Sequence, residues 1–166
     1  SACMASGSEQ LALALHGHTP ELHDYLTQSA GFKQTIRGIR NLKKLGQRVL
    51  VNTVVTKPNY RHLPDITKLL ISLDVDQMQL AFVHALGSAA LNFDSMVPRL
   101  TLVMPYVIRS IAIARHFDKQ IVTEAIPYCF LKGYEGHVSE QVMPVMKIFE
   151  HDHVVANFTE SRLTEG

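Results

Sequence analysis

The chain has 166 residues, of which 46% are hydrophobic and 19% are charged, and its formal net charge is +1. This composition is typical of a globular domain with a buried core. A net charge near zero argues against nucleic acid as a partner, because nucleic-acid surfaces need an excess of clustered cations. The densest basic group surrounds one predicted helix and is explained by a solvated helix face: Arg37, Arg40, Lys43, Lys44 and Arg48. No apolar run approaches the roughly 20 residues that span a membrane, so no membrane partner is expected.

The two cysteines, Cys3 and Cys129, are too few for a disulfide framework, so we expect a protein of the reducing cytoplasm. They are also too few for an iron–sulfur cluster, which usually takes three or four thiolates. We expect Cys129 to be a buried structural thiol, since no nucleophile signature lies beside it. Residues 1–10 are small and polar, show no signal peptide, and are predicted to be a disordered leader or a remnant of a cloning vector.

The first predicted unit runs from a strand at residues 11–15 to a second strand at residues 48–56. The run LALAL is continuously apolar, which predicts a strand covered on both faces. Thr19 is a candidate N-cap with Pro20 at the first helical position. An inward helix face is predicted at positions spaced three and four apart, namely Phe32, Ile36, Ile39, Leu42 and Leu45. Gly46 ends this helix, and the unit is a parallel βαβ motif.

The remaining chain repeats the pattern. A helix begins near Pro64, a third strand covers residues 77–84, and a long loop follows at residues 85–99. The next helix extends to Phe117 with Pro105 in or near its first turn, so that it starts at or after Leu100 and buries Ile108, Ile111, Ala112 and Ala114. A fourth strand at residues 120–126 precedes a loop at residues 128–136. Residues 140–150 fit either a helix or a strand, and residues 151–166 are predicted to be a polar, loosely held tail.

These elements predict an α/β fold with about four parallel strands and three helices in residues 11–150. A closed eight-stranded barrel typically needs about 250 residues. The chain therefore forms either a small open sheet or a partial, half TIM-type barrel with a C-terminal extension. The early start of the first strand favours the half barrel.

Ligands of parallel α/β folds lie at the carboxyl ends of the strands. The polar candidates at those ends are His16, His18, Thr56, Lys57, Asn59, His84, Gly87, Ser88, Glu124 and Tyr128. Asn52, Gln79 and Glu124 lie within strands and need partners, because burying an unpaired polar group costs a few kcal/mol. For Asn52 and Gln79 a satisfied core hydrogen bond is as good an explanation as a ligand contact, whereas the charge of Glu124 favours a function.

The sequence His16-x-His18 suggests a metal site, since two residues on one strand point to the same side. His84 and Glu124 are the available further ligands for a metal-dependent hydrolase of this kind. The alternative is that this segment starts the next helix through Thr19. The other histidines are expected to be scattered on the surface: His23, His62, His116, His137, His151 and His153.

Four segments follow one another in the chain: LHGHTPELHDYLT, VNTVVTKPNYRHLPDI, QLAFVHALGSAALNFDSMVPR and TEAIPYCFLKGYEGHVSE. In this order they resemble the second half of radical S-adenosylmethionine proteins of the uncharacterised iron–sulfur oxidoreductase type. The likeness covers about residues 11–140. It implies a six-stranded partial barrel, of which this chain holds the last three strands and an extension. Relatives often carry serine where this chain has Ala14.

The resemblance implies that a four-iron four-sulfur cluster, held by a CxxxCxxC loop, reduces S-adenosylmethionine to a 5′-deoxyadenosyl radical. That loop is absent from these 166 residues, so the chain alone is predicted to bind no cluster and to be inactive. By position the resemblance implies that Asn52, His84, Gly87 and Ser88 lie near S-adenosylmethionine. It places Glu124 and Tyr128 nearer the substrate, with His16 and His18 as further candidates on that side.

Three functions stay open at this point. The first is a fragment of a radical S-adenosylmethionine oxidoreductase whose partner is the missing N-terminal half of the barrel. The second is a metal-dependent hydrolase fragment that uses His16 and His18. The third is a non-catalytic interaction module that associates with itself through exposed sheet edges.

Overall fold

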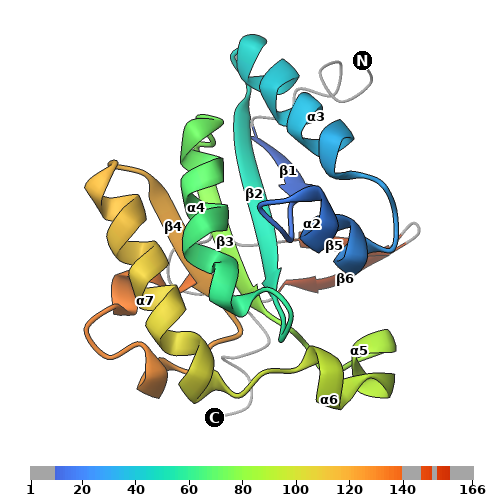
Figure 1. The fold of residues 1–166 in the computed structure, drawn as a ribbon, viewed down its shortest axis with the longest axis vertical. Coiled ribbons are helices and arrows are strands. Elements are labelled where there is room, and N and C mark those ends of the chain that lie inside the picture. Colours follow the sequence, from blue (N-terminus) through green and yellow to red (C-terminus); the bar gives the residue numbers. More distant parts are fainter. Residues whose placement is uncertain (1–9, 140–146, 151–152, 158–166) are drawn as a thin grey trace.

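The computed structural model describes residues 10–139, 147–150 and 153–157. Four parallel strands form one sheet in the order β1-β2-β3-β4 (Figure 1). Their bounds are β1 Gln10–Ala14, β2 Arg48–Val55, β3 Gln77–Phe82 and β4 Gln120–Glu124. The predicted α/β fold of four parallel strands is thus confirmed.

Four longer helices connect or flank the strands: α2 (Pro20–Thr27), α3 (Phe32–Lys44), α4 (Leu63–Ser72) and α7 (Leu100–His116). The loop predicted at residues 85–99 contains two short helices, α5 (Ser88–Leu91) and α6 (Phe93–Met96). Single 3₁₀ turns occur at Tyr60–His62, Tyr128–Phe130 and Glu135–His137. Near the C-terminus, β5 (Lys147–Glu150) pairs antiparallel with β6 (His153–Asn157). The strand alternative for residues 147–150 is therefore correct, β6 lies in the expected loose tail, and residues 140–146 lie outside the described part.

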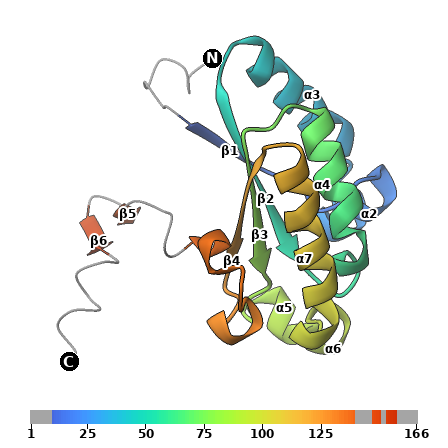
Figure 2. The same cartoon turned by 90° about the vertical axis from the view of Figure 1, so that its left-hand side faces the viewer.

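The helices α3, α4 and α7 all lie on one side of the sheet (Figure 2). Right-handed crossovers between consecutive neighbouring strands always return the chain over the same face, which explains this arrangement. The expectation that the first strand is covered on both faces is wrong, because the residues of β1 alternate between half-buried and exposed. Leu13 packs against the core on the helix side of the sheet. Ala12 and Ala14 are exposed on the opposite side, which no described α-helix covers and which is called the bare face below.

The core lies between the sheet and its three covering helices. It contains alternate residues of each strand together with the inward faces of α3, α4 and α7: Ile39, Val49, Val51, Ile66, Leu70, Met78, Leu80, Val107, Ile111 and Ile121. These side chains are all nearly or fully buried. Their alternation leaves the opposite set of strand residues free to line the bare face.

Several local predictions need correction. One helix was expected between the first two strands, and the structure has two, α2 and α3, because the chain turns at Gln28, where φ is +52°. Gly46 follows α3 with φ of +69°, as its stop position requires, but Leu45 is 56% exposed and lies outside the helix. The helix α7 begins at Leu100 and contains Pro105 in its interior, and Ala112 on it is exposed.

At the amino ends of the strands, an ion-pair cluster ties α3 to the sheet. Lys43 Nζ lies 2.8 and 2.7 Å from the two carboxylate oxygens of Asp76, and the Val49 N–H donates to Asp76 Oδ2 at 2.7 Å. Lys119 lies 2.6 Å from Asp74, which the Lys43 ammonium also approaches at 3.8 Å. These contacts stabilise the end of the sheet opposite to the candidate site.

Among the described residues, one helical stretch, Phe93–His116, is long and apolar enough to cross a membrane, with a mean hydropathy of 1.4. This stretch is not a continuous apolar run in the sequence, because charged residues interrupt it, so it was not expected. Within it, Val103, Val107 and Ile111 of α7 are fully buried against the protein core. A core helix passes the same length and composition test, so this stretch is weak evidence for a membrane span.

Candidate functional site

The carboxyl ends of the four strands meet at one edge of the sheet, and the loops after β1 and β2 are joined there by Asn59. Asn59 is fully buried, and its Nδ2 donates to the carbonyls of His16 (2.9 Å) and Val54 (2.8 Å). Its Oδ1 accepts from the Thr56 N–H at 2.7 Å. One side chain therefore fixes both loops, which gives Asn59 a positioning role that its place after a strand did not by itself reveal.

A buried pair of histidines supports the same corner. The Val54 N–H donates to His16 Nδ1 at 3.2 Å, and the His16 N–H donates to His23 Nδ1 at 3.1 Å. The two rings stack with their centroids 6.0 Å apart. Burial, followed by the neighbouring His23, lowers the pKa of His16 from 6.5 to about 4. Burial also lowers the pKa of His23, against the opposing effect of Asp24. Both rings are thus held neutral, as acceptors of backbone hydrogen bonds.

The alternative in which His16 and His18 form a metal site is not supported, whereas the helix start at Thr19 is confirmed. The strand ends at Ala14, so the two histidines lie in a loop and the alternation of a strand does not apply. His16 packs on His23, whereas the ring of His18 stacks on His62 with centroids 5.0 Å apart. The expectation of scattered surface histidines is therefore also wrong for His23, which is 3% exposed. His62 is on the surface as expected, but its ring contacts that of His18.

The bare face of the sheet carries polar side chains in its centre. In the register of β2 and β3, Asn52 is opposite Gln79, and both belong to the set of residues that points away from the helices. Gln79 Nε2 donates to Glu124 Oε2 of β4, so Gln79 and Glu124 are paired. Asn52 Oδ1 is buried and has no hydrogen-bond partner. A buried acceptor without a donor is costly, so Asn52 Oδ1 is a candidate acceptor for a ligand's N–H or O–H group.

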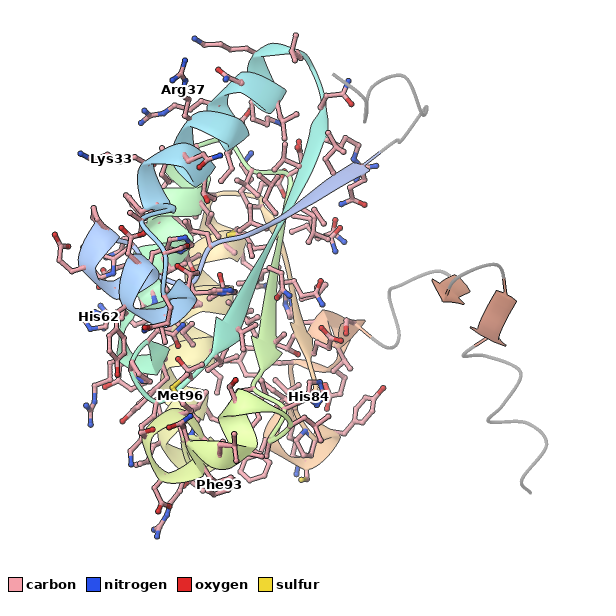
Figure 3. All side chains as sticks on the ribbon, turned by 90° about the vertical axis from the view of Figure 1, so that its right-hand side faces the viewer. Lys33, Arg37, His62, His84, Phe93 and Met96 are labelled. Carbon is pink, nitrogen blue, oxygen red and sulfur yellow. The ribbon has the colours of Figure 1, made fainter. Side chains whose placement is uncertain are left out.

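The other predicted cofactor and substrate residues lie at the loops. His84, Gly87 and Ser88 are exposed at the end of β3, and Tyr128 is 49% exposed after β4. Figure 3 shows His84, Phe93 and Met96 together at the carboxyl end of the sheet. The loop after β3 is tied to the loop after β2, since the Lys57 N–H donates to the Met96 carbonyl at 2.8 Å.

A cavity of about 340 Å³ lies between α2 and the two short helices of this loop. Of the predicted cofactor residues, only Ser88 lines it; the rest of its wall is Tyr25, Leu26, Gln28, Ala89, Asn92, Ser95 and Met96. The predicted site residues therefore lie in four places: the bare face, the exposed loop ends, this cavity, and the loop after β1 that carries His16 and His18. Cys129, expected to be buried, is exposed, because it lies in the 3₁₀ turn after β4.

No family model matches the chain. A curated relative, the AdoMet-dependent heme synthase of Oleidesulfovibrio alaskensis, is 33% identical over 86 residues, which cover 51% of this chain and 22% of the relative. The fold is similar to Streptococcus suis SuiB bound to S-adenosylmethionine, with a TM-score of 0.58 and 14% identity, over 76% of this chain and 29% of SuiB. The proteins to which this chain is similar are radical S-adenosylmethionine enzymes.

A structure of SuiB bound to the precursor peptide SuiA gives the same result, with a TM-score of 0.57, 14% identity and coverage of 85% of this chain and 30% of that one. The radical S-adenosylmethionine resemblance is therefore confirmed, and the fold is a partial version of the SuiB barrel. The chain spans about a fifth to a third of the length of these relatives.

Proposed function

We propose that this chain supplies part of the S-adenosylmethionine and substrate pocket of a radical S-adenosylmethionine enzyme, with the bare face of its sheet as the pocket wall. The observation that carries the proposal is Asn52, whose buried Oδ1 has no partner in the centre of that face. Its neighbours Gln79 and Glu124 form a polar pair on adjacent strands. In full-length relatives the cofactor supplies the radical chemistry, and the protein's part is to hold and orient it.

In this proposal each residue has a task that its surroundings support. Asn52 accepts a hydrogen bond from the amino or hydroxyl groups of S-adenosylmethionine. The exposed backbone at Gly87 and Ser88 lies at the carboxyl end of β3, where ligands of parallel sheets bind. Glu124 and Tyr128, on and after β4, face the substrate side, and the Gln79 amide keeps the Glu124 carboxylate in place.

The four-iron four-sulfur cluster does not fit the donors of this chain, because cluster sites take more thiolates than Cys3 and Cys129 can provide. We therefore propose that the chain is inactive alone. Anaerobic reconstitution with iron and sulfide is expected to leave the monomer colourless. A stoichiometric cluster on the monomer would contradict this part of the proposal.

A titration with S-adenosylmethionine tests the pocket itself. The side-chain amide signals of Asn52 and Gln79 in ¹⁵N-resolved NMR spectra report directly on the bare face, and we expect both to shift on binding. Asn52→Ala removes one hydrogen bond and should weaken binding about threefold to tenfold, since a net hydrogen bond contributes about 1 kcal/mol.

Gln10→Ala is the matched control, because Gln10 lies at the opposite end of the same sheet and bonds only to Gln77 at 3.2 Å. The control should bind as the parent does. The proposal fails if the amide signals of the bare face do not move, or if both variants weaken binding equally.

We further propose that the outer edge of β1 pairs with a strand from the remainder of the barrel. In the described part of the chain, β1 pairs with β2 alone. No other described strand pairs with that edge, so its outward backbone groups are accessible. The same edge supports self-association when the remainder of the barrel is absent.

A further inference from the structure

Three side chains of metal-ligating type lie together outside the proposed pocket. His18, His62 and Asp65 each offer one ligand atom, and these atoms lie within 4.8 Å of one another. The rings of His18 and His62 stack at 5.0 Å with an interplanar angle of 29°. Figure 3 shows His62 beside α2 and far from His84, so the cluster is separate from the carboxyl end of β3.

The backbone that carries these side chains is held in place from several directions. His18 lies between the buried Gly17 and Thr19, the N-cap of α2, whose Oγ1 accepts from the Leu22 N–H at 3.4 Å. At Gly17 a Cβ atom would meet the backbone nitrogen of His23 at 2.5 Å, so the loop lies directly on α2 and no larger residue fits.

The two other members of the cluster lie at the start of α4. His62 is the N-cap residue of that helix, and Asp65 is in its first turn. The loop that leads to them is fixed by the buried Asn59, which also bonds to the His16 carbonyl two residues before His18. The backbone positions of the cluster are therefore fixed by contacts of neighbouring residues, so its three side chains remain available to a ligand.

We infer that His18, His62 and Asp65 form a binding site for a divalent first-row transition metal ion, with Zn²⁺ as the representative ion. Two neutral imidazoles and a carboxylate are a donor set typical of such ions, with a fourth position left for water. His18 Nδ1 is buried without a hydrogen-bond partner, so this ring has no competing protein acceptor or donor at that atom.

The geometry and charge of the site suit such an ion. Ligand atoms on one tetrahedral ion lie about 3.3 Å apart, because each bond is about 2.0 Å long. The ligand atoms of the cluster lie within 4.8 Å of one another, so small side-chain rotations, for example of the exposed Asp65, would bring them to this spacing. Its ion pair with Lys68, at 3.4 Å, is solvent-exposed and worth little, so it does not prevent coordination.

A second carboxylate, Glu21, lines the same open recess of about 420 Å³ as His18 and His62. Together with Asp65 it offsets the positive ends of the helices α2 and α4. Metal binding at this point joins the loop after β1 to the start of α4. We therefore assign the site a stabilising role, independent of S-adenosylmethionine.

Zinc titration against a chromophoric chelator tests the assignment. We expect the chain to bind one Zn²⁺ ion, and we expect His62→Ala and Asp65→Asn each to weaken binding by tenfold or more. Bound Co²⁺ should give the visible absorption of a low-coordinate site in the parent chain, and this absorption should be lost in His62→Ala. Circular dichroism establishes that each variant is folded.

His116→Ala is the matched control, since His116 lies on the exposed side of α7 and its ring makes an edge-to-face contact with Phe117. It should leave zinc affinity unchanged. A double variant of His151 and His153 controls for the second pair of closely spaced histidines in the sequence and should also bind as the parent does. Retained affinity in both His62→Ala and Asp65→Asn, or loss of binding in the double variant, would overturn the assignment. Neither result bears on the proposed cofactor pocket.

Discussion

The two outer edges of the sheet differ in what covers them. Beyond β4, the Thr123 position forms a parallel bridge with Val138, Thr123 Oγ1 donates to the His137 carbonyl at 3.2 Å, and His137 Nδ1 lies 2.8 Å from the Ile121 carbonyl. The β1 edge has no such cover in the residues that the structure describes. A capped edge ends a sheet and an open edge can be continued, so the β1 edge is the one at which we propose that the remainder of a barrel joins.

The largest expected effect concerns the corner where β1 ends. Asn59→Ala removes three hydrogen bonds from a fully buried side chain and leaves the His16 and Val54 carbonyls unpaired. We expect a loss of about 3 kcal/mol in the free energy of unfolding, measured by urea denaturation. Asn92→Ala is the control, because Asn92 is exposed and donates only to the Ser88 carbonyl. Equal losses in the two variants would mean that Asn59 does not join the two loops.

The capped edge is tested by Val138→Ala. Val138 is 1% exposed, and shortening it removes packing from the segment that covers β4. We expect a loss of about 1–2 kcal/mol and faster hydrogen exchange at the β4 amides. Val54→Ala, on the half-buried bare face, should cost less. Unchanged exchange at β4 would show that this segment does not protect the edge.

The histidine pair predicts a pH dependence of stability that originates on the β1 side of the sheet. Because burial lowers the pKa values of His16 and His23 in the folded state, the unfolded chain binds more protons below pH 6.5. Stability is therefore complete well above pH 6.5 and falls as the pH drops through 6.5 towards about 4. Between about pH 7.5 and 5.5 the loss at His16 is about 1 kcal/mol.

His16→Asn keeps an acceptor for the Val54 N–H but cannot titrate, so it should flatten this part of the curve. Urea denaturation at several pH values measures the effect. A parent and variant with the same pH dependence would show that His16 is not the group responsible.

The smallest change in stability, and the sharpest test of the bare edge, is Ala12→Pro. In an edge strand of a parallel sheet, the N–H groups of successive residues point alternately to the neighbouring strand and to the open edge. The Leu15 N–H bonds to β2, and Ala12 has the opposite parity, so the Ala12 N–H points to the open edge. Proline there should cost less than about 1 kcal/mol, since edge strands tolerate it. It should abolish association at high concentration, measured by light scattering. Ala12→Thr retains the N–H and should associate as the parent does; a parent that stays monomeric contradicts the edge proposal.

Much of the local structure was predictable from the sequence. The strand positions, the Thr19 N-cap and Pro64 in the first turn of α4 follow from short-range patterns that the structure contains. His23 was misjudged because its burial depends on how α2 packs against the loop after β1. The one available indication was its place between Leu22 and Leu26, near the inward face of a helix.

The candidate site was less predictable than the fold. Asn52 and Glu124 were identified because polar residues in apolar strands need partners, and the structure gives one to Glu124 and none to Asn52. The metal-type cluster was missed in its actual form, since His18 is 44 residues from His62 in sequence and the two meet only when the loops after β1 and β2 come together. A pattern confined to neighbouring residues therefore selected His16 in place of His62.

The sequence by itself determined the alternation of strands and helices, because hydrophobic spacing and capping residues act over a few positions. It also carries the prediction that the chain alone holds no four-iron four-sulfur cluster, because the sequence has two cysteines and such clusters usually take three or four thiolates. Only the tertiary structure decided that, within the described residues, no helix covers one face of the sheet and no strand pairs with the outer edge of β1, and that His18 meets His62 and Asp65. These features depend on the direction in which each crossover returns, and no local pattern of residues encodes which distant loops then become neighbours.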